Sequence, residues 1–289
     1  MLTELLKPYK TIAIIGMAKN SGKTTVLNHI IGKHPDTLGI TSIGRDGEVK
    51  DVVTNTEKPR IFVRTGTIIA TAAQFFESAD ILKETLFVTD INTPLGQVVI
   101  FRACSDGFVE IAGASIVSQM GYLVECMRNF NAKKIIIDGA VGRKSLANPQ
   151  IAEAVILCTG AAISQNMQTV VAETAFAVKM LMLPKIDDES YVYLPKLVTD
   201  QLLAEYVKVP PKGIIIDDAT KLFISPQMYK KMQIKGIKLG VKTPINLIAV
   251  TINPTSPYGL GFESQKLLSG VQAVVDLPVY DVVKYPSVC

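Results

Sequence analysis

The sequence predicts an α/β fold built on a doubly wound, mostly parallel sheet. Short apolar runs rich in β-branched residues alternate along the chain with stretches of helical periodicity, as in repeated βαβ units. Most of these runs lack alternation of polar and apolar residues, which is typical of strands buried on both faces of a sheet. At 289 residues and 48% hydrophobic content, the chain is long enough for one large domain or two modest ones. Since no linker rich in Ser, Gly or Pro divides it, we expect a single domain over residues 1–289.

The expected elements follow this alternation in order. The predicted strands are the apolar runs at 11–15, 39–42, 61–63, 134–137, 154–158, 213–216 and 246–252. The predicted helices lie at 24–33, 68–76, 115–129, 165–183 and 198–206.

Two segments depart from the alternation. Residues 86–113 contain two or three strands separated by turn signals at Thr93-Pro94-Leu95-Gly96 and at Asp106-Gly107, so we expect an antiparallel hairpin insertion at the edge of the main sheet. Residues 184–245 are less regular, with Pro210-Pro211 and many lysines, and are interpreted as a small subdomain without a clean boundary.

Composition excludes several classes of function. The net charge is +4, but the basic residues are spread along the chain without the long run that a nucleic-acid-binding arm shows, so no nucleic-acid partner is expected. Four cysteines without a C-x-x-C pair, and two histidines, fit neither a disulfide framework nor a zinc site. The first ten residues are too short and too charged for a signal peptide, and no apolar run reaches about 18 residues. We therefore expect a cytoplasmic protein that does not bind a membrane.

The stretch IAIIGMAKNSGKTTVLNHII, residues 12–31, has the layout of a phosphate-binding (P-loop, Walker A) segment. An apolar strand leads into a glycine-containing turn, and a helix with an apolar face follows. A chance Gly-Lys-Thr in a turn would lack this context on both sides. The spacing predicts that Lys23 lies between the terminal phosphates of a nucleotide, that Thr24 coordinates Mg²⁺ and that Gly22 lets the backbone approach the phosphate. The candidate nucleotide-binding residues are Gly16, Lys19, Asn20, Ser21, Gly22, Lys23, Thr24 and Thr25.

A second magnesium anchor is expected from an aspartate that closes a buried strand. In KKIIIDGAVGRKS, Asp138 follows three isoleucines, and Gly139 lets the chain turn close to the phosphate. A helix-capping aspartate is the alternative. A rival run, GIIIDDATK, offers Asp217 and Asp218 later in the chain, so the choice between Asp138 and Asp217 stays open.

The loop is one residue longer than the usual P-loop. Read as Gly16-Met-Ala-Lys-Asn-Ser-Gly-Lys-Thr24, it resembles the elongated loop of dethiobiotin synthetases. These belong to the group of P-loop proteins that includes MinD, nitrogenase iron protein and the signal-recognition GTPases. Lys19 is not at the second position of the loop, where MinD-like ATPases have their signature lysine. A MinD-type dimer switch is therefore in doubt, although a homodimer stays open.

This resemblance implies further site residues. The end of the second strand in dethiobiotin synthetases presents a cation and a carboxylate to metal and substrate, which makes Arg45 and Asp46 candidates here, Asp46 with a catalytic and metal-binding role alongside Lys23 and Asp138. A solvated turn is the alternative reading of Arg45 and Asp46. An Asn that closes a late strand often contacts the base in this group, which makes Asn253 a candidate, although an Asn-Pro pair also simply starts a turn.

Three further observations concern the ligand. Arg143 and Lys144 could reach an anionic substrate, and Thr159-Gly160 could line a second subsite or only permit tight packing. The guanine signature N-K-x-D is absent from the sequence, which favours ATP.

Segments between about residues 10 and 165 are also similar to a family of small P-loop proteins found with clostridial amino-acid fermentation genes. They are IGMAKNSGKTT, GITSIGRDGE, KPRIFV, GTIIATA, TPLG, IAGAS, IIIDGAVGRKS and ILCTGAAIS. The resemblance implies an accessory ATPase that reactivates a cobalamin-dependent lysine or ornithine aminomutase with ATP and Mg²⁺. Two alternatives stay open: an ATP-dependent kinase or ligase of dethiobiotin-synthetase type that acts on a small carboxylate, and a non-hydrolysing nucleotide-binding module that uses residues 86–113 as an interaction edge.

Overall fold

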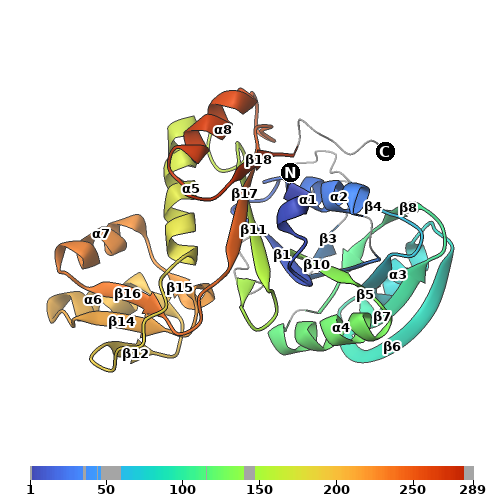
Figure 1. Cartoon of the computed structure of the whole chain (residues 1–289), viewed down its shortest axis with the longest axis horizontal. Coiled ribbons are helices and arrows are strands. Elements are labelled where there is room, and N and C mark those ends of the chain that lie inside the picture. The colour runs from blue at the N-terminus through green and yellow to red at the C-terminus, as the bar shows by residue number, and fades with distance from the viewer. Residues whose placement is uncertain are drawn as a thin grey trace.

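The computed structural model describes residues 2–34, 37–43, 45–46, 60–114, 116–139 and 147–282, with the backbone alone described at 45–46. A nine-stranded sheet forms its centre, in the order β18-β17-β11-β1-β10-β2-β5-β7-β6 (Figure 1). The seven strands from β18 to β5 are parallel, and β7 and β6 are antiparallel to their neighbours. The predicted α/β class with a mostly parallel sheet is confirmed.

The strands of this sheet are β1 (Thr11–Gly16), β2 (Leu38–Ile43), β5 (Ile68–Ala72), β6 (Lys83–Thr93), β7 (Gly96–Ala103), β10 (Lys134–Gly139), β11 (Ala154–Gly160), β17 (Leu247–Asn253) and β18 (Val279–Asp281). The helices around it are α1 (Leu2–Leu5), α2 (Lys23–Lys33), α3 (Ala73–Ser78), α4 (Val117–Asn129), α5 (Met167–Leu181) and α8 (Ser264–Gln272). Short ribbons pair β3 (Arg45–Asp46) with β9 (Ile111–Ala112) and β4 (Ile61–Val63) with β8 (Gly107–Val109). None of the described helices has both the length and the apolar composition needed to cross a bilayer.

Alternate residues of the central strands enter two different cores. Ile12 and Ile14 of β1 pack in one core with buried residues of α1 and α2. Ala13 and Ile15 pack in the other with residues of α4, α5 and α8. Because β1 is covered on both faces, it needs apolar residues at every position, which explains the unbroken apolar run in the sequence. Because β1 is the fourth of the nine strands, its carboxyl end lies near the middle of the row of strand ends.

The helix predicted at 68–76 is wrong over its first half. Residues Ile68–Ala72 form β5, which lies between β2 and β7 and is buried at all five positions. The β-branched side chains of Ile68, Ile69 and Thr71 favour a strand once partners exist on both sides. The helix α3 then covers the rest of the segment.

The edge of the sheet is a hairpin, but one of its expected turns is wrong. β6 and β7 pair antiparallel across Pro94-Leu95. The predicted hairpin turn at Asp106-Gly107 does not form, because β8 pairs with β4 instead of β7. The Asp106 carboxylate accepts hydrogen bonds from the Thr65 amide at 2.7 Å and hydroxyl at 2.9 Å, and a side chain at Gly107 would clash with Ile81. Close packing therefore accounts for this glycine.

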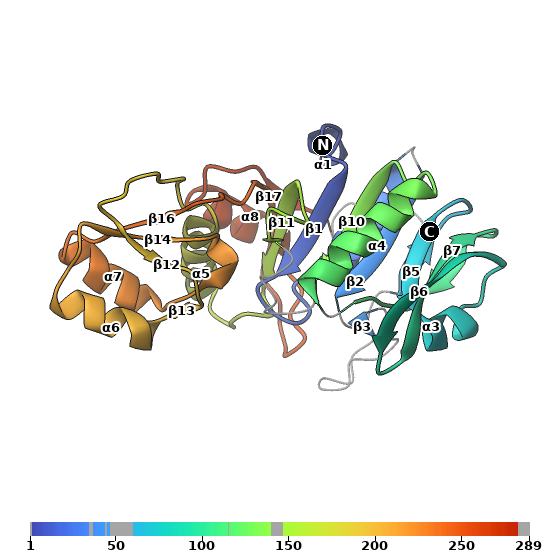
Figure 2. The same cartoon turned by 90° about the horizontal axis from the view of Figure 1, so that it is seen from below.

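Residues 184–245 contain a second, three-stranded parallel sheet in the order β12-β14-β16. We call residues 184–245 the small lobe; its strands are β12 (Val192–Leu194), β14 (Gly213–Ile216) and β16 (Lys238–Val241). The helices α6 (Asp200–Lys208) and α7 (Pro226–Ile234) lie on one side of this sheet (Figure 2). β13 (Val198–Thr199) pairs with β15 (Leu222–Phe223), so the helix expected at 198–206 begins two residues later, where the Thr199 hydroxyl caps it.

Candidate nucleotide site

The loop 17–22 leaves the carboxyl end of β1 between β10 and β11. The amide of Met17 donates to the carbonyl of Cys158 at 2.9 Å, which fixes the start of the loop to β11. Asn20 and Gly22 have left-handed backbone conformations, with φ of 60° and 94°, on either side of Ser21. Alternation of left- and right-handed residues turns successive N–H groups toward one side and forms an anion-binding concavity. The two left-handed residues of this loop match that requirement.

Helix α2 begins directly after this loop. Its N-cap is Gly22, so no side chain caps the amides of the first turn. These amides carry the positive end of the helix dipole, and Thr24 and Thr25 lie half-buried among them. An anion bound at this point would accept hydrogen bonds from these amides, which no side chain caps.

Gly16 is required by close packing of the loop over the end of β1. A Cβ at Gly16 would lie 2.5 Å from the Ser21 hydroxyl and 3.0 Å from Cδ of Lys23. Ser21 and Lys23 are both buried, Lys23 with 7% of its surface exposed. The stem of Lys23 therefore runs back over Gly16, while Lys19 lies exposed near the tip of the loop.

Asn253, at the end of β17, holds the loop in place. Its Nδ2 donates to the carbonyl of Asn20 at 2.9 Å, and its Oδ1 accepts from the amide of Thr255 at 3.0 Å. Its Cβ lies 3.1 Å from where a Cβ of Gly22 would be, and a side chain at Gly160 would clash with its carbonyl. The anchoring role was not expected from the sequence, where the strand-ending Asn-Pro pair was its only signal. The predicted contact with the base stays a prediction.

Asp138 lies on β10, the strand next to β1, where it is paired in register with Ile14. It is fully buried. On the other side of β1, Cys158 is paired with Gly16, and burial is the main cause that raises the pKa of its thiol to about 12. Lys23 lowers that pKa and Asp138 raises it, so both charged groups act on the same point at the carboxyl end of β1. Cys158 stays protonated at neutral pH and is no nucleophile here.

The rival acids Asp217 and Asp218 lie in the small lobe, on a different sheet from the loop. Asp217 is hydrogen-bonded by the hydroxyl of Tyr193 and by Nζ of Lys221. Burial alone would raise the pKa of Asp217, but these two hydrogen bonds outweigh it and lower the pKa below its ordinary value. Asp218 caps a short 3-10 helix by accepting from the amide of Thr220 at 2.8 Å. Both carboxylates therefore have structural partners of their own.

The remaining candidates are only partly described. The backbone of Asp46 pairs with Ile111 in the β3–β9 ribbon. This ribbon lies next to the end of β2, since the Ser42 hydroxyl of β2 donates to the Ile111 carbonyl at 3.1 Å. The side chains of Arg45 and Asp46, and all of Arg143 and Lys144, lie outside the described residues.

Thr159, the candidate for a second subsite, is fully buried, and its hydroxyl lies 2.6 Å from that of Thr174 on α5. It therefore packs β11 against this helix. The neighbouring Gly160 has a φ of 157° and lies against the carbonyl of Asn253.

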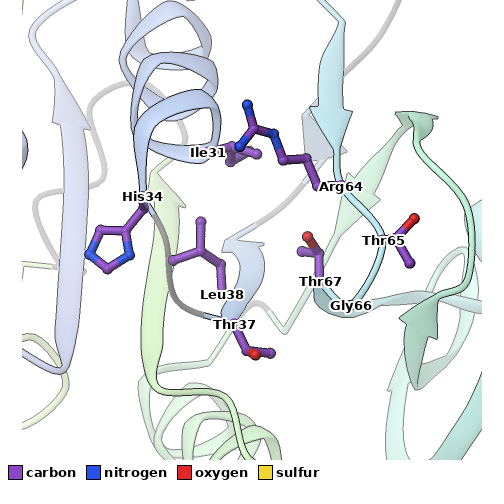
Figure 3. Close-up of a pocket in the computed structure, with 8 residues that line it drawn as sticks. All are labelled: Ile31, His34, Thr37, Leu38, Arg64, Thr65, Gly66 and Thr67. Atoms are coloured by element: carbon purple, nitrogen blue, oxygen red, sulfur yellow. The ribbon is translucent and has the colours of Figure 1, made fainter.

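A pocket of about 190 Å³ lies away from this site, near the start of β2 and β5. It is lined by Ile31, His34, Thr37, Leu38, Arg64, Thr65, Gly66 and Thr67 (Figure 3). The Arg64 guanidinium donates to the carbonyl of Gly32 at 2.8 Å, so it satisfies the end of α2, and Asp106 holds Thr65. These contacts give Arg64 and Thr65 structural partners.

No protein-family model, curated protein or solved structure matches this chain. Among the described residues, no three His, Cys, Asp or Glu side chains gather as a metal-binding group. Magnesium bound with a nucleotide needs fewer protein ligands than that, since one hydroxyl or carboxylate, the phosphates and water complete its coordination. Thr24, in the first turn of α2, and Asp138, near the carboxyl end of β10, carry oxygen donors of this kind.

Proposed function

We propose that this chain binds ATP with Mg²⁺ at residues 16–25 and hydrolyses it. The observation that carries the proposal is the pair of left-handed residues, Asn20 and Gly22, immediately before a helix whose first residue is the buried Lys23. This combination supports phosphate binding, because left-handed residues before a helix favour inward-turned backbone amides and the lysine that follows carries the positive charge that a phosphate needs. The absence of a guanine signature in the sequence supports ATP as the nucleotide.

Each residue then has a chemical role. The loop amides and Lys23 hold the β- and γ-phosphates and stabilise the negative charge that shifts during transfer. Thr24 offers a hydroxyl to Mg²⁺, and Asp138 holds a water or the metal from the neighbouring strand. When bound, Mg²⁺ neutralises phosphate charge. Asp46 follows β2 at the same edge and completes the predicted set.

We further propose that the hydrolysis serves a partner enzyme, in the manner of an aminomutase reactivation factor. The similarity of segments between about residues 10 and 165 supports this reading. A radical enzyme that has lost its adenosyl group holds the damaged cofactor tightly, so exchanging it needs an energy input. ATP hydrolysis provides one by favouring one of two conformations of the complex.

Calorimetric titration and turnover assays test the proposal together. ATP with Mg²⁺ should bind, hydrolysis by the chain alone should be slow, and a cobalamin-dependent lysine or ornithine aminomutase should accelerate it. Rapid phosphorylation or ligation of a small carboxylate by the chain alone would favour the dethiobiotin-synthetase-type alternative. Binding without hydrolysis under either condition would favour the interaction module, and no binding heat with any purine nucleotide would overturn the proposal.

A further inference from the structure

One end of the small lobe concentrates positive charge. Residues 184–245 contain ten lysines, no arginine and seven acidic residues, so they account for most of the net charge of +4. The helices α6 and α7 end where β14 and β16 begin, and the amide of Lys238 donates to the carbonyl of Lys212 at 3.3 Å across this end. We call this surface the basic end; it comprises Lys208, Val209, Lys212, Lys231, Ile234, Lys235 and Lys238.

The ion pairs of the small lobe neutralise only part of this charge. Lys208 pairs with Glu205 and Lys212 with Asp188, both at 2.8 Å. Lys231, Lys235 and Lys238 are exposed and form no ion pair within the part of the chain that the structure describes. A lysine at the end of a helix offsets the helix dipole, which accounts for Lys208, Lys231 and Lys235 but not for Lys238 at the start of a strand.

Two aliphatic side chains project from among these lysines. Val209 is 81% exposed and Ile234 75% exposed, although both are large enough to gain from burial. Each directly follows or precedes a lysine of the basic end, at the end of α6 and of α7. Apolar residues surrounded by charged ones are the usual anatomy of a protein–protein contact that forms and dissociates.

The composition of the basic end favours an acidic protein over other polyanions. Arginine, which reads duplex phosphates and bases bidentately, does not occur in residues 184–245. The one described aromatic ring in contact with a lysine of this end is Tyr191, which lies 5.4 Å from Nζ of Lys212. Stacking platforms for nucleic-acid bases and aromatic belts for a bilayer both need more than that.

We propose that the basic end docks an acidic protein surface, with Val209 and Ile234 at the centre of the contact and the lysines around them. Identifying that surface with the enzyme on which the ATPase acts rests on the proposed function; the docking itself does not. Helix α5 connects the two parts. It follows β11 beside the loop and packs on the small lobe, where Phe176 and Tyr229 stack edge-on with ring centroids 6.0 Å apart.

Fluorescence anisotropy with a short labelled helical peptide of Glu and Leu tests the docking. The native chain should bind it, and the triple variant K231E/K235E/K238E should bind about tenfold more weakly or worse. That variant should instead bind the matching peptide of Lys and Leu. The control variant K10E/K33E/K133E lowers the net charge equally at exposed lysines of the main sheet and its helices, and should bind the Glu–Leu peptide as the native chain does.

Further variants keep the result interpretable. K231Q/K235Q/K238Q removes the charges without placing acids at the end of α7, and V209S/I234S tests the apolar centre; each should weaken binding. Equal binding by the native chain and the charge-reversed variant would overturn the proposal. So would stronger binding of the native chain to phosphatidylserine vesicles or duplex DNA than to the Glu–Leu peptide. ATP titration of the same proteins separates the docking proposal from the proposed function. The affinity for ATP should be unchanged in every variant. If the native chain does not bind ATP, the proposed function is refuted and the docking proposal is not.

Discussion

Two strands of this molecule contain three isoleucines that an aspartate follows, and the sheets around them give the two aspartates different surroundings. In β10, Asp138 lies beside the strand that leads into the loop and is fully buried. Asp217 directly follows β14 in the small lobe, where Lys221 and Tyr193 hydrogen-bond to its carboxylate. The local pattern predicts a buried parallel strand in both cases and is right in both. What an aspartate can bind is set by its neighbouring strand, which comes from a distant part of the chain.

The largest effects that test the comparison between the two aspartate sites are expected at the lysine near each of them, Lys23 and Lys221. Lys23→Ala should abolish measurable ATP binding, a loss of about 100-fold or more, because the phosphates lose their one buried ammonium. Lys221→Ala, which removes the partner of Asp217, should leave ATP affinity unchanged. Isothermal titration with ATP and Mg²⁺ measures both. Tight ATP binding by the Lys23 variant would contradict the assignment of the loop.

The aspartates themselves come next in expected effect. Asp138→Asn should reduce Mg²⁺-dependent ATP hydrolysis by about tenfold or more while reducing nucleotide affinity less, because it weakens metal or water positioning. Asp217→Asn is the matched control, with the same change after the same three isoleucines, and should hydrolyse ATP at the native rate. A steady-state assay across Mg²⁺ concentrations measures this, and the reverse outcome would make Asp217 the metal-side acid.

The anchor of the loop should have a smaller effect. Asn253→Ala removes the hydrogen bond to the Asn20 carbonyl, at a cost of about 1 kcal/mol, and should weaken ATP binding roughly fivefold. Asn246→Ala is the control, since Asn246 stands just before the same strand and donates to the carbonyl of Glu153 at 2.8 Å. It should lower the melting temperature without changing ATP affinity. Equal losses of affinity in the two variants would show that Asn253 acts through general stability.

The smallest effect concerns the stability of the small lobe. Asp217→Asn should lower the free energy of unfolding at pH 7 by about 0.5–1 kcal/mol, because it removes the ion pair with Lys221. The pKa of Asp217 is lowered from its ordinary 3.8, so this stabilisation is present above that pH and is lost as the pH falls through the folded-state pKa. Urea unfolding of both proteins at pH 7 and pH 3 measures the difference, which should be smaller at the lower pH. A constant difference would show that the carboxylate charge contributes nothing.

The sequence predicted what depends on short-range pattern. The central strands were recognisable because strands covered on both faces are apolar throughout, and the loop because strand, glycine turn and helix follow one another within twenty residues. Residues 68–72 were misassigned because their strand partners, β2 and β7, lie elsewhere in the chain. The same holds for Asn253, whose bond to Asn20 spans 233 positions.

The turn at Asp106-Gly107 failed for a related reason. Its dipeptide favours a hairpin locally, but Asp106 bonds Thr65, and β8 finds its partner in β4. The local preference of a turn dipeptide stabilises the chain less than a strand partner and two hydrogen bonds from a distant residue do. The sequence likewise showed that residues 184–245 are rich in lysine, but only the register of β14 and β16 shows which lysines share one end.

A crystal structure with Mg²⁺ and a non-hydrolysable ATP analogue tests the central claim most directly. The account predicts that the β- and γ-phosphates accept hydrogen bonds from the amides between residues 17 and 24, that Nζ of Lys23 contacts them, and that the metal lies on the side of Asp138. A triphosphate bound at any other place, such as beside Asp217 in the small lobe, would contradict it.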